Sequence, residues 1–213
     1  TLNQNITLDA TGILTLTAGK LAINKNKITV NNPAIGAVVR TSGYLYSEDA
    51  TLTGANANNS SYVTWAIGTT TGAHVYPFGK SATEYIPFTY NLGGGDIGNL
   101  TVSTYASNAA NTPMPIGVTQ VHDTLSTPAD NSEYTVDRYW NLTSSMNSAT
   151  TASFTFTYAD AEIPGAGETG ADGLGLRAQQ WNGGNSWAYD NDPTAGVSWI
   201  AYFRNQTATP ASN

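Results

Sequence analysis

The 213-residue sequence contains no cysteine and only two histidines. The absence of cysteine excludes disulfides, thiol catalysis and thiolate metal sites, and two histidines are too few for a histidine-rich metal centre. No run of about 18 apolar residues is present, so the sequence predicts no transmembrane helix. Charged residues make up only 11% of the chain, whereas ordinary soluble domains contain about 25%.

Basic residues are especially scarce, with eight Lys and Arg against fifteen Asp and Glu and a net charge of −7. Nucleic acids and anionic membranes are bound through Lys and Arg, so neither is an expected partner. Thr, Asn and Ser supply 68 residues instead. That composition, together with a first residue that is Thr1 and not Met, fits an exported protein without its signal peptide or a chain cut from a longer one. We therefore expect an extracellular or cell-surface location.

Strand patterns dominate the sequence, and helical periodicity is almost missing. Short runs rich in Val, Ile, Thr, Tyr and Phe are bounded by Gly, Asn and Asp, and 40% of the residues are hydrophobic. These features predict an all-β fold, with an antiparallel, jelly-roll-like β-sandwich over residues 33–206 and a polar tail over 207–213. Aromatic residues alternate with Thr in Phe154–Tyr158, which predicts one buried face. The expected strands are Val38–Thr41, Tyr44–Tyr46, Tyr62–Ile67, Tyr85–Tyr90, Leu100–Tyr105, Val118–His122, Tyr134–Leu142, Ala152–Tyr158, Leu174–Trp181 and Val197–Phe203.

Residues 1–32 carry a different pattern, in which short triplets with apolar ends recur every seven or eight residues. Two architectures fit: a β-meander packed on the sandwich, or a short parallel β-solenoid in which Ile6 stacks on Ile28. Either would leave an edge that invites strand addition from a second chain. We therefore expect this segment to act in assembly through the side chains of Ile6, Leu8, Leu14, Leu16, Leu21, Ile23, Ile28 and Val30.

Several short motifs occur together: Gly43–Glu48, Val63–Gly68, Tyr76–Gly79, Val136–Trp140, Phe156–Glu162 and Trp181–Trp187. In this order they resemble a β-rich module of large extracellular proteins from Bacteroidota, which is often found near type IX secretion sorting domains. The resemblance implies an exported surface or adhesin-like protein. It carries over no catalytic residue.

Paired carboxylates are the best candidates for catalysis, because glycoside hydrolysis needs two of them across a sugar site. Asp160 and Glu162 would point the same way if a strand continued through them, although they could equally be solvated or pair with Arg138 or Arg177. The two histidines, His74 and His122, lie beside expected strands and read as surface residues, and no Gly-X-Ser-X-Gly elbow is present. We expect no enzymatic activity.

Two acidic loops could hold Ca²⁺, which prefers several carboxylate oxygens. The same Asp and Asn residues could instead bond their own backbone in turns. No other cofactor is expected. The candidate calcium ligands are Asp160, Glu162, Asp172, Asp190 and Asp192.

A Trp-rich segment suggests carbohydrate binding, because aromatic faces stack on sugar rings. A Gly-Gly turn between Trp181 and Trp187 would form a hairpin with one Trp at each end and Asn182 beside them. The two rings could instead simply stabilise each other. The sequence thus favours a non-enzymatic extracellular structural subunit or adhesive module that self-associates, polymerising into fibres through its N-terminal strands. A carbohydrate-binding module is the alternative.

Overall fold

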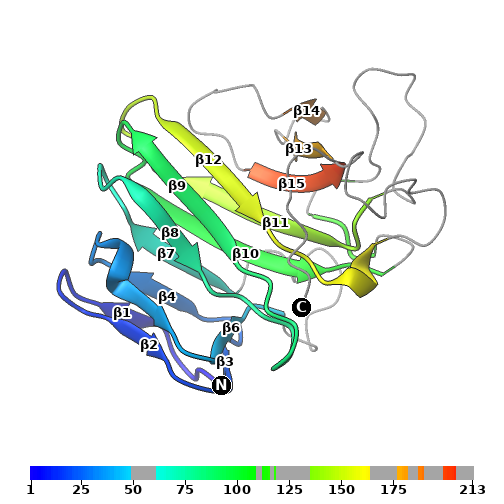
Figure 1. The fold of residues 1–213 in the computed structure, drawn as a ribbon, viewed down its shortest axis with the longest axis horizontal. Helices are drawn as coiled ribbons and strands as arrows, with labels where there is room; N and C mark the ends of the chain where they lie inside the picture. Colours follow the sequence, from blue (N-terminus) through cyan, green and yellow to red (C-terminus); the bar gives the residue numbers. More distant parts are fainter. Residues whose placement is uncertain are drawn as a thin grey trace.

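The computed structural model describes residues 1–48, 61–108, 112–115, 118 and 135–163, together with the backbone of three later strands at 177–181, 187–189 and 199–204. Within these ranges the chain forms strands and short 3₁₀ turns (Figure 1). The expected all-β class is therefore confirmed. Among these residues there is no helix of the length and hydrophobicity needed to cross a membrane.

The N-terminal strands pair in parallel and not with their neighbours in sequence. Strand β1 pairs with β4, β2 with β5, and β3 with β6. The first ladder aligns Ile6 with Ile28, which is the stacking a solenoid requires, whereas a meander would pair consecutive strands antiparallel. The ranges are β1 (Ile6–Leu8), β2 (Leu14–Leu16), β3 (Lys20–Ala22), β4 (Lys27–Val30), η1 (Ile35–Ala37), β5 (Val38–Arg40) and β6 (Tyr44–Tyr46).

A polar corner turns the chain from β3 into β4. Asn24 and Lys25 have positive φ angles of 53° and 64°, a conformation that Asn adopts more readily than most residues. The side-chain amide of Asn26 donates to the carbonyls of Leu2, Ile23 and Asn24. These bonds give hydrogen-bond partners to carbonyl groups that lie beyond the ends of the paired strands.

The parallel ladder continues into an antiparallel sheet at β7, which pairs in parallel with β4 and antiparallel with β10. This gives an eight-stranded sheet in the order β1-β4-β7-β10-β11-β15-β13-β14, and a three-stranded sheet in the order β12-β9-β8. The ranges are β7 (Tyr62–Ala66), β8 (Gly72–Tyr76), β9 (Phe88–Gly94), β10 (Asn99–Ala106), β11 (Arg138–Ser144), β12 (Thr151–Phe156), η4 (Asp160–Glu162), β13 (Arg177–Trp181), β14 (Trp187–Tyr189) and β15 (Trp199–Arg204).

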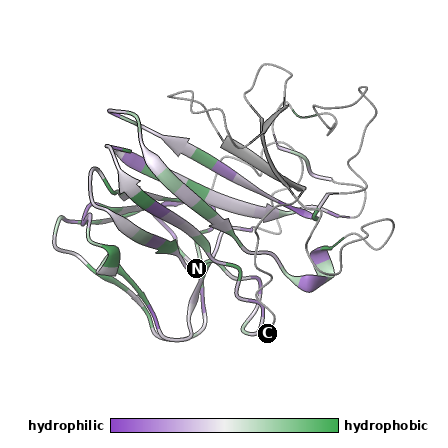
Figure 2. Ribbon diagram, turned by 45° about the horizontal axis from the view of Figure 1, so that its top comes forward, coloured by the Kyte–Doolittle hydropathy of each residue, from purple (hydrophilic) through white to green (hydrophobic). Residues whose placement is uncertain are grey.

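Aromatic side chains fill the space between the two sheets, which lie one over the other in Figure 1. Trp65 of β7 contacts Tyr76 of β8 with ring centroids 5.5 Å apart, and Trp140 of β11 contacts Phe156 of β12 at 5.2 Å. Both Trp side chains are fully buried. Figure 2 shows hydrophobic and hydrophilic residues alternating along these strands, which is the pattern of a sheet with one buried face.

Some strand boundaries differ from the expected ones. The strand expected at Tyr85–Tyr90 begins at Phe88 and runs through Gly94, because paired strands tolerate glycines that read as a loop. The strand expected from Tyr134 begins at Arg138. The sequence predicts no strand at β8, because Gly72 and His74 interrupt its apolar pattern.

Two further points concern the burial of β12 and the strand expected at Val118–His122. Phe154 keeps 37% of its surface exposed, so the aromatic face of β12 is only partly covered. Val118 lies in no strand, and the rest of the strand expected there, residues 119–122, lies outside the described residues.

The stacking of Ile6 on Ile28 predicts unequal costs for the same substitution in adjacent strands. Ile28 is fully buried, whereas Ile6 is half-buried. Replacing Ile28 with Ala should lower the free energy of unfolding by about 2–5 kcal/mol, and Ile6→Ala should lower it by clearly less. Urea unfolding followed by tryptophan fluorescence measures both, and equal losses would contradict this stacking.

Candidate functional site

The first turn of parallel strands presents an edge on which the described residues place no strand. β1 begins the order of the eight-stranded sheet, while β2 and β3 each have one strand partner. We call the sides of these three strands that face away from β4, β5 and β6 the β1–β3 edge. On the β3 side, the carbonyl of Ala22 accepts the N–H of Leu2 at 2.8 Å. Backbone groups at such an edge can accept a strand from another chain.

The backbone directions show which groups face this edge. The carbonyls of Leu8 and Leu16 accept bonds from Asn31 and Thr41, so they point inward to the next turn of strands. Successive residues of a strand point their backbone groups to opposite sides. The N–H and C=O of the middle residues, Thr7 and Thr15, therefore face outward.

In β1 and β3 the apolar side chains behind this edge are less covered than their counterparts one turn further on, whereas Leu16 of β2 is buried. Ile6, Leu8 and Leu21 are half-buried. Their ladder partners, Ile28, Val30 and Leu45, are fully buried. A strand added at the edge would therefore remove further apolar surface from water.

Of the eight assembly residues expected from the sequence, Ile6, Leu8, Leu14, Leu16 and Leu21 belong to this first turn. Ile23, Ile28 and Val30 instead belong to the core and are fully buried, and Leu16 of the first turn is a buried core residue as well. The expected assembly set thus divides into an edge group and a core group.

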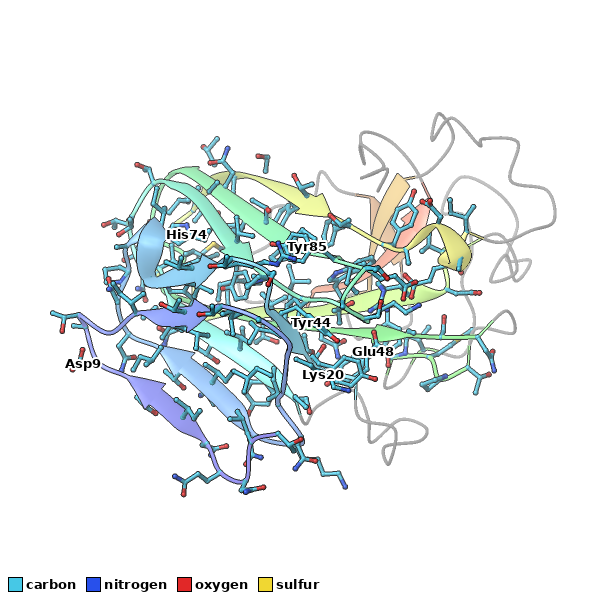
Figure 3. All side chains as sticks on the ribbon, turned by 60° about the horizontal axis from the view of Figure 1, so that its bottom comes forward. Asp9, Lys20, Tyr44, Glu48, His74 and Tyr85 are labelled. Atoms are coloured by element: carbon cyan, nitrogen blue, oxygen red, sulfur yellow. The ribbon has the colours of Figure 1, made fainter. Side chains whose placement is uncertain are left out.

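The charged residues around the edge lie at its margins. Lys20 opens β3, and its ammonium group lies 4.4 Å from the centre of the Tyr46 ring. Asp9 lies at the tip of the turn after β1 (Figure 3), where its carboxylate accepts bonds from the N–H and hydroxyl of Thr11 at 2.8 and 2.9 Å. These bonds lower the pKa of Asp9. The centre of the edge, Ile6–Leu8 and Leu14–Leu16, carries no charge.

The two candidate catalytic acids do not point the same way. Both lie in the 3₁₀ turn η4, where Asp160 is exposed and Glu162 is buried. The hydrolase interpretation assumed a strand through these residues, but they form a 3₁₀ turn instead. Glu162 instead pairs with Arg138, which was the alternative to catalysis that the sequence offered.

Arg138 is the centre of a buried charge cluster. Its Nε and Nη2 atoms donate to the two carboxylate oxygens of Glu162 at 2.9 and 2.7 Å, and Nη2 also donates to Glu48 at 2.6 Å. Lys80 lies 2.9 Å from Glu162, and the hydroxyl of Thr104 accepts from Arg138 at 3.0 Å. The cluster joins five segments of the chain, because its members are Glu48, Lys80, Thr104, Arg138 and Glu162.

The cluster favours the charged forms of Arg138 and Glu162 through their pKa values. Burial alone would raise the pKa of Glu162, but hydrogen bonds and charge from Arg138 lower it overall. Burial would likewise lower the pKa of Arg138, but Glu48 and Glu162 raise it. Neighbouring Asp137 has a raised pKa, mainly through burial and then through the charge of Glu162. A carboxylate held this firmly is suited to fixing structure and not to transferring protons.

His74 is buried and does not lie on the surface as expected. Its two ring nitrogens lie 3.2 Å from the carbonyl of Gly72 and 3.1 Å from that of Pro33, and its ring meets Trp65 edge-on at 4.9 Å. It therefore connects β8 to the loop after β4. His122 lies outside the described residues.

The hairpin expected around the two Trp residues is formed at the backbone level. Strands β13 and β14 pair antiparallel, with Trp181 directly opposite Trp187. Asn182 lies outside the described residues, as do the candidate calcium ligands Asp172, Asp190 and Asp192. The described residues contain no group of three or more His, Asp or Glu able to hold a metal ion.

Comparison with known proteins gives no match to a protein-family model, a curated protein or a solved structure.

Removing one partner from the buried cluster should be costly. We expect Glu162→Gln to lower the free energy of unfolding at neutral pH by about 3–5 kcal/mol, because it leaves Arg138 buried with reduced compensation. The matched control is Asp160→Asn, two residues away and exposed, which should change stability by at most about 0.5 kcal/mol. Equal stability of the two variants would contradict the role assigned to Glu162.

The same pair of variants tests a pH dependence. A lowered pKa in the folded state means that Glu162 stabilises the protein above its unfolded pKa of about 4.3. This contribution is lost as the pH falls through the lower, folded pKa. Urea unfolding at several acidic pH values should show that loss in the parent protein and in Asp160→Asn, but not in Glu162→Gln.

Proposed function

We propose that this chain is a non-enzymatic, extracellular structural or adhesive module that associates with another subunit through its β1–β3 edge. The observation that carries the proposal is the edge itself. Its three consecutive strands have outward-facing backbone groups at Thr7 and Thr15, and Ile6, Leu8, Leu14 and Leu21 behind them are half-buried. The low charge and the Thr, Asn and Ser content favour the extracellular location. The resemblance to adhesin-like modules of Bacteroidota agrees with this function.

In this proposal the chain has two structural parts. Residues 1–48 begin a short parallel β-solenoid, supported by the ladders at offsets of 22 and 24 residues. The antiparallel strands form a sandwich against it, supported by the aromatic contacts between the two sheets. The buried charges serve to lock these parts together, because Glu48 follows β6 and Arg138 lies in β11.

Edge variants test the proposal better than a truncation. Deleting residues 1–32 would remove Ile23, Ile28 and Val30 from the core, so loss of assembly would be uninformative. Proline at Thr7 and Thr15 removes only outward-facing N–H groups and is tolerated at sheet edges. We expect the double variant Thr7→Pro/Thr15→Pro to remain folded and to lose self-association in sedimentation analysis.

The matched control for this experiment is Thr7→Val/Thr15→Val, which keeps both N–H groups and the β-branched shape. It should associate as the parent protein does. Association that survives the proline substitutions would show that the subunits join elsewhere, and the proposal would then fail.

Carbohydrate binding is the second candidate function, favoured by the cross-strand position of Trp181 and Trp187. Two aromatic residues side by side on a hairpin suit a linear glycan, and each could stack on one sugar ring. In this role the module would attach to polysaccharide at a cell surface.

Glycan array screening with the parent protein and Trp187→Ala tests this candidate. A positive signal should fall at least about tenfold in the variant, which corresponds to 1.4 kcal/mol. Trp65→Phe, a change in the buried core, is the control and should leave the signal unchanged. A parent protein that binds no glycan removes the candidate.

A further inference from the structure

Three lysines lie around the corner that turns β3 into β4. Lys20 opens β3, Lys25 lies in the corner itself, and Lys27 opens β4. Residues 1–48 hold four of the eight Lys and Arg residues of the chain but only two of its fifteen Asp and Glu residues. This part is therefore positive in a chain whose net charge is −7. We call Lys20, Lys25 and Lys27 the lysine corner.

Two tyrosine rings lie beside the ammonium groups of this corner. The ammonium of Lys20 lies 4.4 Å from the centre of the Tyr46 ring. That of Lys27 lies 5.8 Å from the centre of the Tyr62 ring. Tyr46 is paired with Ala22, the last residue of β3, and Tyr62 is paired with Lys27, so one ring lies on each side of the corner. An ammonium group held near a ring has less freedom to lose when it binds an anion.

The backbone of the corner presents Lys25 outward. Lys25 has a φ of 64°, a conformation that is unfavourable for most residues other than Gly, Asn and Asp. Its N–H donates to the hydroxyl of Ser61 at 2.9 Å, which ties the corner to the residue before β7. The side chain of Lys25 is exposed, so packing does not explain a lysine at this position. Strained backbone of this kind is concentrated at functional sites.

The three lysines have no acidic partner in the described part of the chain. There, Lys80 and Arg138 form all three salt bridges. Glu48, which follows β6 and is labelled with Lys20 in Figure 3, is bonded to Arg138 at 2.6 Å. The lysine corner is therefore open to an anion from outside the protein.

We propose that the lysine corner binds an acidic polysaccharide, with its ammonium groups on the carboxylate or sulfate groups of the sugar chain. This site is separate from the Trp181–Trp187 hairpin and does not depend on the β1–β3 edge. Uncharged polar groups accompany the lysines. Asn5 is exposed and accepts the N–H of Lys27 through its Oδ1 at 2.8 Å. Its amide N–H groups are donors of the kind that bond to sugar hydroxyls.

The charge of the chain favours a sparsely charged polymer over a dense one. Duplex DNA carries one negative charge per about 1.7 Å of its axis. Such a polymer would meet the repulsion of the thirteen Asp and Glu residues outside residues 1–48. A polysaccharide with acidic groups on separate sugars meets less of this repulsion, and its hydroxyls add uncharged contacts.

Affinity electrophoresis of the parent protein in gels that contain polygalacturonate, dextran sulfate or neutral dextran tests this inference. We expect one or both acidic polymers, but not neutral dextran, to retard the protein, and added salt to weaken the retardation. The variant Lys20→Gln/Lys25→Asn/Lys27→Gln should bind at least about tenfold more weakly, because three charge-assisted contacts are lost. The acidic polymer that binds more tightly identifies the preferred acid group.

Two single variants that each remove one positive charge provide the matched comparison. Lys25→Asn should weaken binding without lowering stability in urea, because Asn adopts a positive φ readily. Arg40→Gln should bind as the parent does, because the guanidinium of Arg40 lies 3.7 Å from the centre of the Tyr85 ring and outside the corner. Lys25→Arg keeps the charge and should also bind as the parent does.

Several results would overturn the inference. One is a parent protein that neither acidic polymer retards, and another is a triple variant that is folded and binds as tightly as the parent. Equal weakening by Lys25→Asn and Arg40→Gln would make net charge the cause and not the corner. Equally tight binding of the parent to duplex DNA or to vesicles of anionic lipid would overturn the assignment to carbohydrate. If the triple variant does not fold, the comparison of the two single variants decides.

Discussion

The pairing of β4 with β7 is the constraint on which the rest of the structure depends. β7 is the strand where parallel pairing on one side meets antiparallel pairing on the other. Trp65 of β7 is fully buried in the core and also donates its indole N–H to the carbonyl of Asn32 at 2.7 Å. One strand thus fixes the register of the N-terminal ladders and the position of the sheet that lies over them.

Scarcity of charge gives the buried cluster its importance. The chain has eight basic residues, and two of them, Arg138 and Lys80, both pair with Glu162. Arg138 also pairs with Glu48. A buried ion pair is a poor source of net stability but a demanding specifier of geometry, because every incorrect arrangement leaves a charge unpaired. The cluster is therefore best understood as a means of selecting one packing of the sheets.

The sequence predicts those features that depend on local patterns. Alternation identifies Leu14–Leu16 and Tyr44–Tyr46 as strands, and the recurrence of the triplets leads to the alignment of Ile6 with Ile28. It offers Arg138 as a partner of Glu162 only as one of several alternatives, and it gives no sign of the second partner, Glu48. It also does not distinguish edge from core among the triplets, because Ile6 and Ile28 look alike until the order of the strands is known.

The distance in sequence between Glu48 and Arg138, 90 residues, has a consequence for how the chain reaches its native state. Contacts between distant segments form slowly, because a long loop must close before any contact compensates for the lost entropy. The parallel ladders join residues only 22–24 positions apart. Arg138 and Glu162 are also only 24 residues apart. We therefore expect the ladders to form early and the bond between Arg138 and Glu48 to form late, so that this bond acts as a final check on a correctly folded chain.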